Sequence, residues 1–335
     1  MPVPEIKYCP GTLATGFNTY SPGFIRRMFN GKKVSHILQY NAPERDDAVQ
    51  EMFIENRKHI SISGVQEKLS LVLEKNILRL TTKTERGSYI LKPIPRDVKN
   101  VEQVPANEHL TMQIAKQVYG ISTAENAIIF FANGDPAYIT RRFDVKTDGS
   151  KRGKEDFATL AGKARENDGP DFKYDYSYEE IGLLIQKYVP AWKIEIEKYF
   201  SLVLFNYLFS NGDSHLKNFS IIETDSGDYI LSPAYDLLNT KLHVNDSDFA
   251  LKKGLFADNF KSKSYLKNNH PGKEDFIELG KRIGILEQRT SEIIKPFLLD
   301  QPAVEKLTNN SFLGDKLKKT YYQDYQTKKN YLNAE

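Results

Sequence analysis

The chain has 335 residues and a mass of 38.4 kDa, with 40% hydrophobic and 27% charged residues. This length favours two domains or lobes, and the composition excludes a disordered tail and a fibrous protein. Because 47 basic side chains meet 44 acidic ones, the net charge is only +3. General attraction to polyanions is therefore excluded as the leading function.

Three features of the sequence bear on its compartment. The single cysteine, Cys9, has no partner for an intramolecular disulfide. The first residues, MPVPEIKYCPG, lack the basic and then apolar pattern of a signal peptide. The most apolar stretch, residues 199–209, is well short of the roughly 20 residues that span a bilayer. We therefore expect a cytoplasmic protein with no membrane partner.

The first 60 residues are irregular, with one helix expected at residues 22–29 and a polar helical pattern near 48–58. Alternating side chains then predict a β-hairpin at residues 69–73 and 77–80. A third strand, residues 88–92, stops before a proline that has no amide hydrogen for a ladder. Lys92 should therefore lie at the end of a strand.

The next elements are a helix and another hairpin. Pro105 and Gly120 mark the start and the end of a helix at residues 105–119. Asn-Gly-Asp at residues 133–135 predicts a turn between strands at 127–131 and 137–142.

A polar segment with several glycines follows from residue 146, where we place the boundary between the lobes. Helical spacing then dominates, with only one short β-pair expected near residues 219–231. The expected helices are 178–187, 193–210, 273–283, 288–295 and 314–330.

The loop at residues 211–218, NGDSHLKN, carries the chemistry. Phosphoryl transfer needs a carboxylate that accepts the proton of the attacking hydroxyl and an oxygen ligand for Mg²⁺. Asp213 and Asn218 have the D-x-x-x-x-N spacing of protein-kinase catalytic loops. The β-pair that follows returns the chain to Asp236, which offers a second oxygen ligand for the metal.

Each of these residues also has a structural interpretation. Asn-Gly-Asp forms ordinary turns, and Asp236 has the position of a cap for a helix beginning at Leu237. His215 is expected to brace the loop through hydrogen bonds to backbone carbonyls. Lys217 is the better candidate for neutralising the transferred phosphoryl group.

The other lobe should supply a phosphate cradle and a lysine. Residues 61–68, SISGVQEK, lead into the first hairpin, although they contain one glycine where the usual pattern has three. Lys92 occupies the place of the lysine on the third kinase strand, and Glu108 is its expected ion-pair partner. Arg142 and Phe143 fall where the hinge should run, with backbone groups for adenine.

Taken together, these segments resemble the motifs of the HipA-like serine/threonine protein kinases. The matching stretches, in chain order, are residues 61–68, 91–93, 107–108, 142–144, 155–156, 211–218 and 235–236. The length and the Cys-Pro-Gly opening resemble the short form, the HipT-type toxins of three-component toxin–antitoxin systems. Arg141 departs from the full-length relatives, which have an acidic hinge residue there.

The resemblance implies an α+β, two-lobed protein-kinase-like fold with a small β-rich N-lobe and a mostly helical C-lobe. Residues 1–60 would be an irregular segment packed on the N-lobe, residues 61–145 the nucleotide-binding N-lobe, and residues 146–335 the catalytic C-lobe.

The resemblance also implies the cofactors ATP and Mg²⁺. Asp213 would be catalytic together with Lys217 and His215, and Asn218 and Asp236 would bind the metal. The expected nucleotide-binding residues are Ser63, Gly64, Val65, Gln66, Lys68, Lys92, Glu108, Arg142 and Phe143. Ser61 and Ser63 would be autophosphorylated.

The implied function is a toxin that phosphorylates a host protein, typically an aminoacyl-tRNA synthetase, and thereby inhibits translation. Its implied partners are a helix-turn-helix antitoxin and a small accessory protein that replaces a missing N-terminal subdomain, with DNA reached only through the antitoxin. Two other interpretations remain open. One is a small-molecule kinase of the aminoglycoside or choline type, which has a similar loop. The other is nucleic-acid binding through residues 316–329, where lysines alternate with tyrosines.

Overall fold

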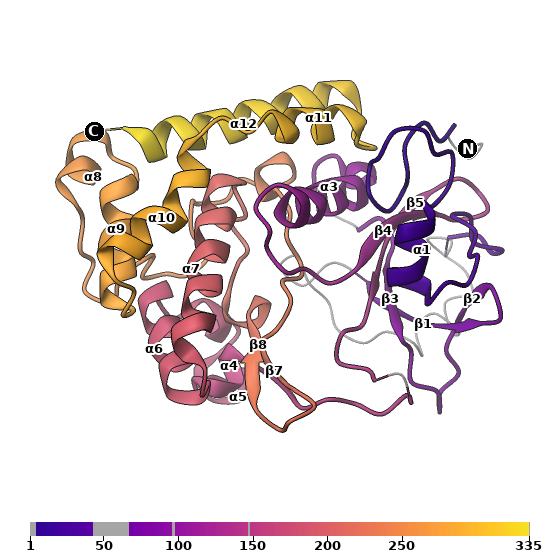
Figure 1. Ribbon diagram of the computed structural model, residues 1–335, viewed down its shortest axis with the longest axis horizontal. Helices are drawn as coiled ribbons and strands as arrows, with labels where there is room; N and C mark the ends of the chain where they lie inside the picture. The colour runs from indigo at the N-terminus through magenta and orange to yellow at the C-terminus, as the bar shows by residue number, and fades with distance from the viewer. Residues whose placement is uncertain (1–4, 43–66, 96–97, 147, 335) are drawn as a thin grey trace.

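The computed structural model describes residues 5–42, 67–95, 98–146 and 148–334. Figure 1 shows a β-rich part, drawn from indigo to magenta, beside a mostly helical part that ends in yellow. This arrangement is the α+β, kinase-like fold that the sequence predicts. The helical pattern near residues 48–58 and the predicted phosphate cradle up to Gln66 lie outside the described residues.

The N-lobe contains a five-stranded antiparallel sheet in the order β2-β1-β3-β5-β4. Both predicted hairpins are present, because the turn residues separate strands of alternating or continuous apolar character. The register places Lys92, the last residue of β3, opposite Tyr138 of β5. The strands are β1 Leu69–Glu74, β2 Ile77–Leu80, β3 Tyr89–Lys92, β4 Asn126–Phe130 and β5 Pro136–Arg141.

The two faces of this sheet bury different cores. Since side chains alternate along a strand, Ala137 and Ile139 of β5 point to one face, where α1 (Pro22–Phe29) packs. Tyr138 points to the other face, against the core that contains α3 (Val104–Gln117). The two helices thus hold the sheet from opposite sides (Figure 1).

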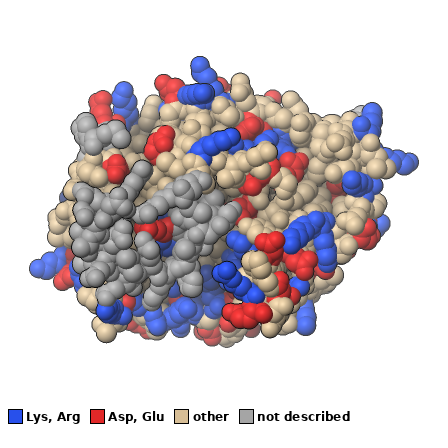
Figure 2. All heavy atoms as spheres, turned by 180° about the vertical axis from the view of Figure 1, so that it is seen from behind, with Lys and Arg blue, Asp and Glu red and all other residues tan. Residues whose placement is uncertain are grey.

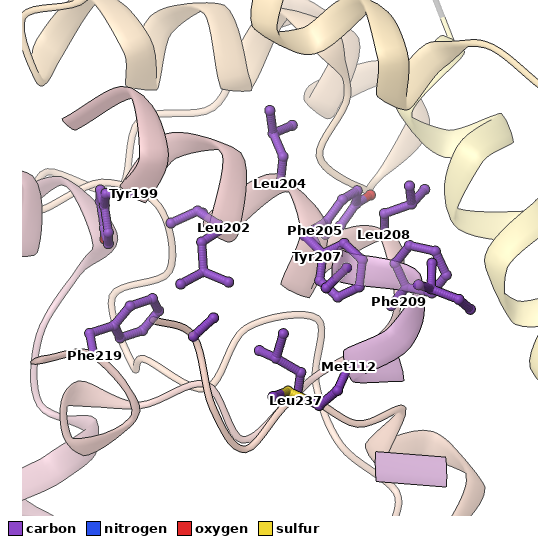
Figure 3. Packing of buried hydrophobic residues seen from close by; sticks show 14 of the residues in the cluster. Met112, Tyr199, Leu202, Leu204, Phe205, Tyr207, Leu208, Phe209, Phe219 and Leu237 are labelled. Atoms are coloured by element: carbon purple, nitrogen blue, oxygen red, sulfur yellow. The ribbon is translucent and has the colours of Figure 1, made fainter. Parts of the chain in front are cut away.

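Helix α3 also joins the sheet to the helical lobe. Its Met112 belongs to the same buried cluster as Leu237 and the core of α7 (Trp192–Leu208), and these side chains lie close together in Figure 3. Polar contacts fix the same junction, because the Asn107 amide donates to the Asn239 carbonyl at 2.7 Å and accepts from its N–H at 3.1 Å. A side chain that satisfies both backbone groups of a partner residue fixes the two segments in one register.

The helical lobe contains more regular structure than the sequence predicts. A third strand, β6 (Lys154–Asp156), pairs with β7 (Ser220–Glu223), which pairs with β8 (Tyr229–Leu231), so the expectation of a single β-pair is wrong. Four short helices were also missed: α4 Phe157–Leu160, α5 Arg165–Asp168, α8 Lys263–Asn268 and α11 Pro302–Asn310. Segments this short have too few residues to show a period.

The long helices follow the predicted ranges to within a few residues. The loop at residues 211–218 follows α7, which is buried along most of its length. The predicted helices are α6 Tyr178–Tyr188, α7, α9 Lys273–Arg282, α10 Glu287–Leu298 and α12 Asp315–Asn333.

The C-terminal helix packs as part of the core. Tyr321 and Tyr325 of α12 are buried, and the ring of Tyr325 stacks on Phe209 at 5.2 Å. Lys328 and Lys329 pair with Asp248 and Asp300. On the face that Figure 2 shows, basic and acidic side chains lie among one another. These contacts argue against nucleic-acid binding through α12, because its central aromatic rings are not exposed to stack on bases.

Within the described part of the chain, no helix is both long enough and apolar enough to cross a bilayer.

Candidate active site

A buried lysine connects the two lobes. The Lys92 ammonium lies 2.6 Å from Oε1 of Glu108 in α3 and 2.5 Å from Oδ1 of Asp236, which follows β8. The ion pair with Glu108 was predicted, and the side chains of both residues are at most 4% exposed. Lys92 thus bridges the N-lobe to a residue of the returning C-lobe segment.

The charges in this network reinforce one another. Burial lowers the pKa of Lys92, but the two facing carboxylates outweigh it and hold that pKa above its usual value. Burial likewise raises the pKa of Asp236, while Lys68 and Lys92 outweigh it and hold that pKa well below its usual value. Lys68 contributes at 3.3 Å from Oδ2. Asp236 is therefore an ionised carboxylate at neutral pH.

The backbone of Asp236 adopts an unusual conformation. Its φ of +57° lies in the left-handed region, which Asp and Asn tolerate better than most residues. Its carbonyl accepts a hydrogen bond from the Asn211 side chain at 3.5 Å. No helix begins at Leu237, so the interpretation of Asp236 as a helix cap is wrong. Strained positions of this kind cluster at functional sites.

The loop after α7 is held tightly against the segment that follows Asp236. The Gly212 N–H donates to Oγ1 of Thr240 at 2.9 Å, and the Thr240 N–H donates to the Ser210 carbonyl at 3.1 Å. A Cβ at Gly212 would lie 2.5 Å from Cβ of Asp246 and 2.7 Å from the Ser247 carbonyl. Glycine is therefore required where the sequence reads Asn-Gly-Asp, and the loop has little freedom.

Asp213 is a largely buried carboxylate with few partners. Its side chain is 14% exposed and accepts a hydrogen bond from the Tyr174 hydroxyl at 3.0 Å. Burial raises its pKa to about 6, although Lys173 and the Tyr174 hydrogen bond act in the opposite direction. Such a group is ionised at neutral pH and still basic enough to accept a proton.

His215 does not have the role that the sequence predicts. Within the described segments, neither ring nitrogen has a hydrogen-bond partner, so the expected hydrogen bonds to backbone carbonyls are absent. Burial lowers its pKa to about 3, with the nearby Lys173 acting in the same direction. The ring is therefore neutral, and its Nε2 lies 3.8 Å from Oδ1 of Asp213. The ring is buried and packs edge-on against Tyr174, with ring centroids 5.2 Å apart.

Lys217 and Asn218 form the end of this loop, in the turn η3 (Leu216–Asn218). The Lys217 ammonium is 3.1 Å from Oδ2 of Asp156, at the end of β6, and its side chain is 47% exposed. The Asn218 carboxamide oxygen accepts from the His215 N–H at 3.2 Å. The Tyr235 hydroxyl donates to the Lys217 carbonyl at 2.9 Å, which ties η3 to the segment that carries Asp236.

At the predicted hinge, Arg142 uses its polar groups within the protein. The Arg142 guanidinium pairs with Asp144 at 2.7 Å, and the backbone N–H of Arg142 donates to the Ser88 carbonyl at 2.9 Å. Phe143 packs against Tyr235 with ring centroids 5.8 Å apart. Lys154 of β6 lies over both rings, at 5.4 and 5.0 Å.

Arg141, which departs from the family pattern, has its own hydrogen-bond partners in the N-terminal segment. Its guanidinium donates to the Arg27 carbonyl at 2.7 Å and to Oδ1 of Asn30 at 2.8 Å. Both partners belong to α1 or to the residue after it, so Arg141 turns toward the N-terminal segment.

The residues around Asp236 fit a magnesium ion by their chemistry. Mg²⁺ takes one or two protein oxygens together with phosphate and water oxygens. Asp236 offers an ionised carboxylate and Asn218 a carboxamide oxygen that has a second lone pair. Among the described residues, no group of three or more His, Cys, Asp or Glu side chains could hold a metal ion. A magnesium site with two protein ligands and additional phosphate oxygens does not require such a group of three.

The structure thus brings together residues from distant parts of the sequence. The charge of Asp236 acts on both Asp213 and His215, and Lys92, Glu108 and Lys68 converge on Asp236 itself. Ser61, Ser63, Gly64, Val65 and Gln66 lie outside the described residues. Tyr174 and Lys173 were not predicted from the sequence, because they stand in a polar stretch 39 residues or more before Asp213, with no motif around them.

Comparisons with known proteins agree with this geometry. Residues 60–303 match the family model of the HipA-like C-terminal domain. A Haemophilus influenzae protein named "Putative kinase" is 28% identical over 282 residues, which cover 77% of this chain and 78% of that protein. "Putative kinase Y4dM" of Sinorhizobium fredii is 32% identical over 248 residues, covering 68% of this chain and 58% of the relative.

Two solved structures share the fold. One comes from the Shewanella oneidensis MR-1 toxin–antitoxin complex of HipA, HipB and operator DNA, with a TM-score of 0.61 and 20% identity. That match covers 86% of this chain and 66% of the other. The Helicobacter pylori proinflammatory kinase CtkA has a TM-score of 0.51 and 14% identity, with 76% and 90% coverage.

Proposed function

This chain belongs to the family of the HipA-like C-terminal domain, and we propose that it is a serine/threonine protein kinase that uses ATP and Mg²⁺. The main support is the convergence of Lys92, Glu108 and Asp236 beside the Asp213 loop. This is the arrangement that phosphoryl transfer requires, with a lysine–glutamate pair, an acidic metal ligand and a proton acceptor near one another.

The chemistry follows from these side chains. Asp213 accepts the proton of a substrate hydroxyl as its oxygen attacks the γ-phosphorus, and the bond to the bridging oxygen of ADP breaks. Asn218 and Asp236 would hold Mg²⁺, which would supply positive charge to neutralise the phosphates. The Lys92 ammonium, which pairs with Asp236, would also contact the phosphates. The Lys217 side chain is exposed enough to reach the transferred phosphoryl group.

We further propose that the protein is the toxin of a type II toxin–antitoxin system and modifies a host protein, with an aminoacyl-tRNA synthetase as the first target to test. The Shewanella relative in the HipA–HipB–DNA complex supports a helix-turn-helix antitoxin as partner. The resemblance to the short form supports a small accessory protein as a further partner.

Regulation by autophosphorylation belongs to the same proposal. A phosphoserine at Ser61 or Ser63 carries about −1.5 to −2 charge, which would repel the triphosphate from the adjacent cradle. Ser61→Asp and Ser63→Asp should each weaken ATP binding, whereas the Ser→Ala variants should not. Unchanged ATP affinity in both aspartate variants would remove this regulatory step.

The function is tested with γ-labelled ATP and a cell lysate. The wild type should label a protein band, and Asp213→Asn should lower the rate of labelling about 10²–10⁴-fold. Label that appears only on small metabolites would favour the small-molecule kinase instead. Absence of any Asp213-dependent label would contradict kinase activity altogether.

A further inference from the structure

The segment before α6 places a tyrosine against the catalytic loop. Tyr174 ends the turn η2 (Phe172–Tyr174), and its carbonyl accepts from the Lys252 N–H at 2.9 Å. The next residues continue this anchoring, because the Tyr178 N–H donates to the Gly254 carbonyl at 3.0 Å. The Tyr174 ring packs edge-on against His215 with centroids 5.2 Å apart. The position of the phenol is therefore fixed from two sides.

The hydroxyl of this tyrosine is the one hydrogen-bond donor to the Asp213 carboxylate in the described part of the chain, at 3.0 Å from Oδ1. A carboxylate that turns freely about its terminal bond presents its oxygens in many directions. A donor fixed at one oxygen selects one orientation and leaves the other oxygen for a substrate hydroxyl.

We propose that Tyr174 is a positioning residue, which orients the Asp213 carboxylate for proton abstraction. This inference rests on the proposed function, since it assigns a role within the same site. Tyr174 does not belong to the D-x-x-x-x-N loop or to any segment that carries the family resemblance.

The charges that face Asp213 come from several elements. Lys173 of η2 attracts the ionised form, whereas Asp246 and Asp236 repel it. His215, in the same loop, is neutral because burial lowers its pKa. Burial itself raises the pKa of Asp213, and the Tyr174 hydrogen bond lowers it. Loss of the hydroxyl should therefore raise the pKa of Asp213 further.

The test compares Tyr174→Phe with Tyr176→Phe, a tyrosine in the same segment that makes no hydrogen bond to Asp213. For Tyr174→Phe we expect kcat to fall about 10- to 100-fold, with KM for ATP unchanged. The acid limb of its pH–rate profile should move to higher pH. Tyr176→Phe should keep the wild-type kcat and profile.

Two results would overturn the positioning role. One is a wild-type kcat and pH profile in Tyr174→Phe, and the other is an equal loss in both variants, which would indicate a merely structural segment. A readout independent of activity is the ¹³C carboxyl titration of Asp213, assigned by its absence in Asp213→Asn. Tyr174→Phe should raise that pKa, and an unchanged value would contradict the contact even in a protein without kinase activity. Conversely, a wild type that transfers no phosphate would contradict the proposed function, but the ¹³C titration of Asp213 would still test the contact with Tyr174.

Discussion

The two halves of the site satisfy their buried polar groups in opposite ways. On the N-lobe side, the Lys92 ammonium has carboxylates of Glu108 and Asp236 within 2.6 Å. On the C-lobe side, Asp213 has one side-chain donor, and the ring of His215 has no hydrogen-bond partner among the described residues. The first half is a closed ionic network, and the second half is desolvated and incompletely paired.

This difference indicates which half prepares the site and which half performs the chemistry. Burying polar groups without partners costs stability, and such groups persist where a ligand supplies what is missing. The paired network keeps Asp236 ionised, whereas the unpaired loop keeps Asp213 basic. Removing the charge of Lys92 should therefore destabilise the fold, whereas removing the charge of Asp213 should stabilise it.

The largest effect is expected in the paired half. Lys92→Met leaves two facing carboxylates without their shared cation, and breaking a buried pair costs about 3–5 kcal/mol. Urea unfolding measures this loss. The matched control is Lys68→Met, whose 3.3 Å contact with Asp236 is 20% exposed on the lysine side and should cost about 1 kcal/mol or less. Equal losses in the two variants would contradict the special role of the closed network.

The unpaired half should respond in the other direction. The pKa of Asp213 is raised to about 6 from an ordinary value of 3.8, so the folded protein binds this proton more tightly than the unfolded chain does. The group therefore destabilises the fold as pH rises from about 4 to about 6. Asp213→Asn removes that effect and should be about 2–3 kcal/mol more stable than the wild type at pH 7.5.

The control for this prediction is the pH itself. Below about pH 3 the wild-type carboxyl is protonated in both states, so Asp213→Asn should have the stability of the wild type there. A variant that is less stable at pH 7.5, or equally stabilised at pH 3 and pH 7.5, would show that Asp213 is not a desolvated carboxylate.

A smaller effect is expected from crowding the loop that carries Asp213. Gly212→Ala places a methyl group 2.5 Å from Cβ of Asp246, and such overpacking costs about 1–3 kcal/mol. The rate of phosphoryl transfer should also fall, because the loop that carries Asp213 must shift to make room for the methyl group. Gly23→Ala in α1 meets nothing closer than 3.8 Å and should leave both quantities unchanged. Wild-type stability in Gly212→Ala would mean that the loop is not tightly held.

The sequence predicts the parts of this site that lie on continuous patterns. The proline after Lys92 ends β3 and so places Lys92 at the end of the strand, and helical spacing places Glu108 within reach. The hairpin at β7 and β8 returns Asp236 toward the loop. These inferences succeed because local period and turn chemistry fix where the side chains go.

Contacts between segments without a pattern could not be predicted. β6 has three residues, Lys-Glu-Asp, which do not resemble a strand and form one only because β7 offers an edge. Tyr174 and Lys173 reach Asp213 through tertiary packing of η2 on the catalytic loop. His215 was misassigned for the same reason, since its burial depends on neighbours that are distant in the sequence.

The most direct test of the shared nucleotide site is calorimetric titration with a nonhydrolysable ATP analogue, with and without Mg²⁺. The wild type and Asp213→Asn should bind the analogue with similar Kd values in the presence of the metal, because Asp213 acts on the hydroxyl. Asp236→Asn, which keeps a residue that tolerates positive φ, should lose the dependence on Mg²⁺. A wild type that does not bind the analogue, or an Asp236→Asn variant with unchanged Mg²⁺ dependence, would contradict the account.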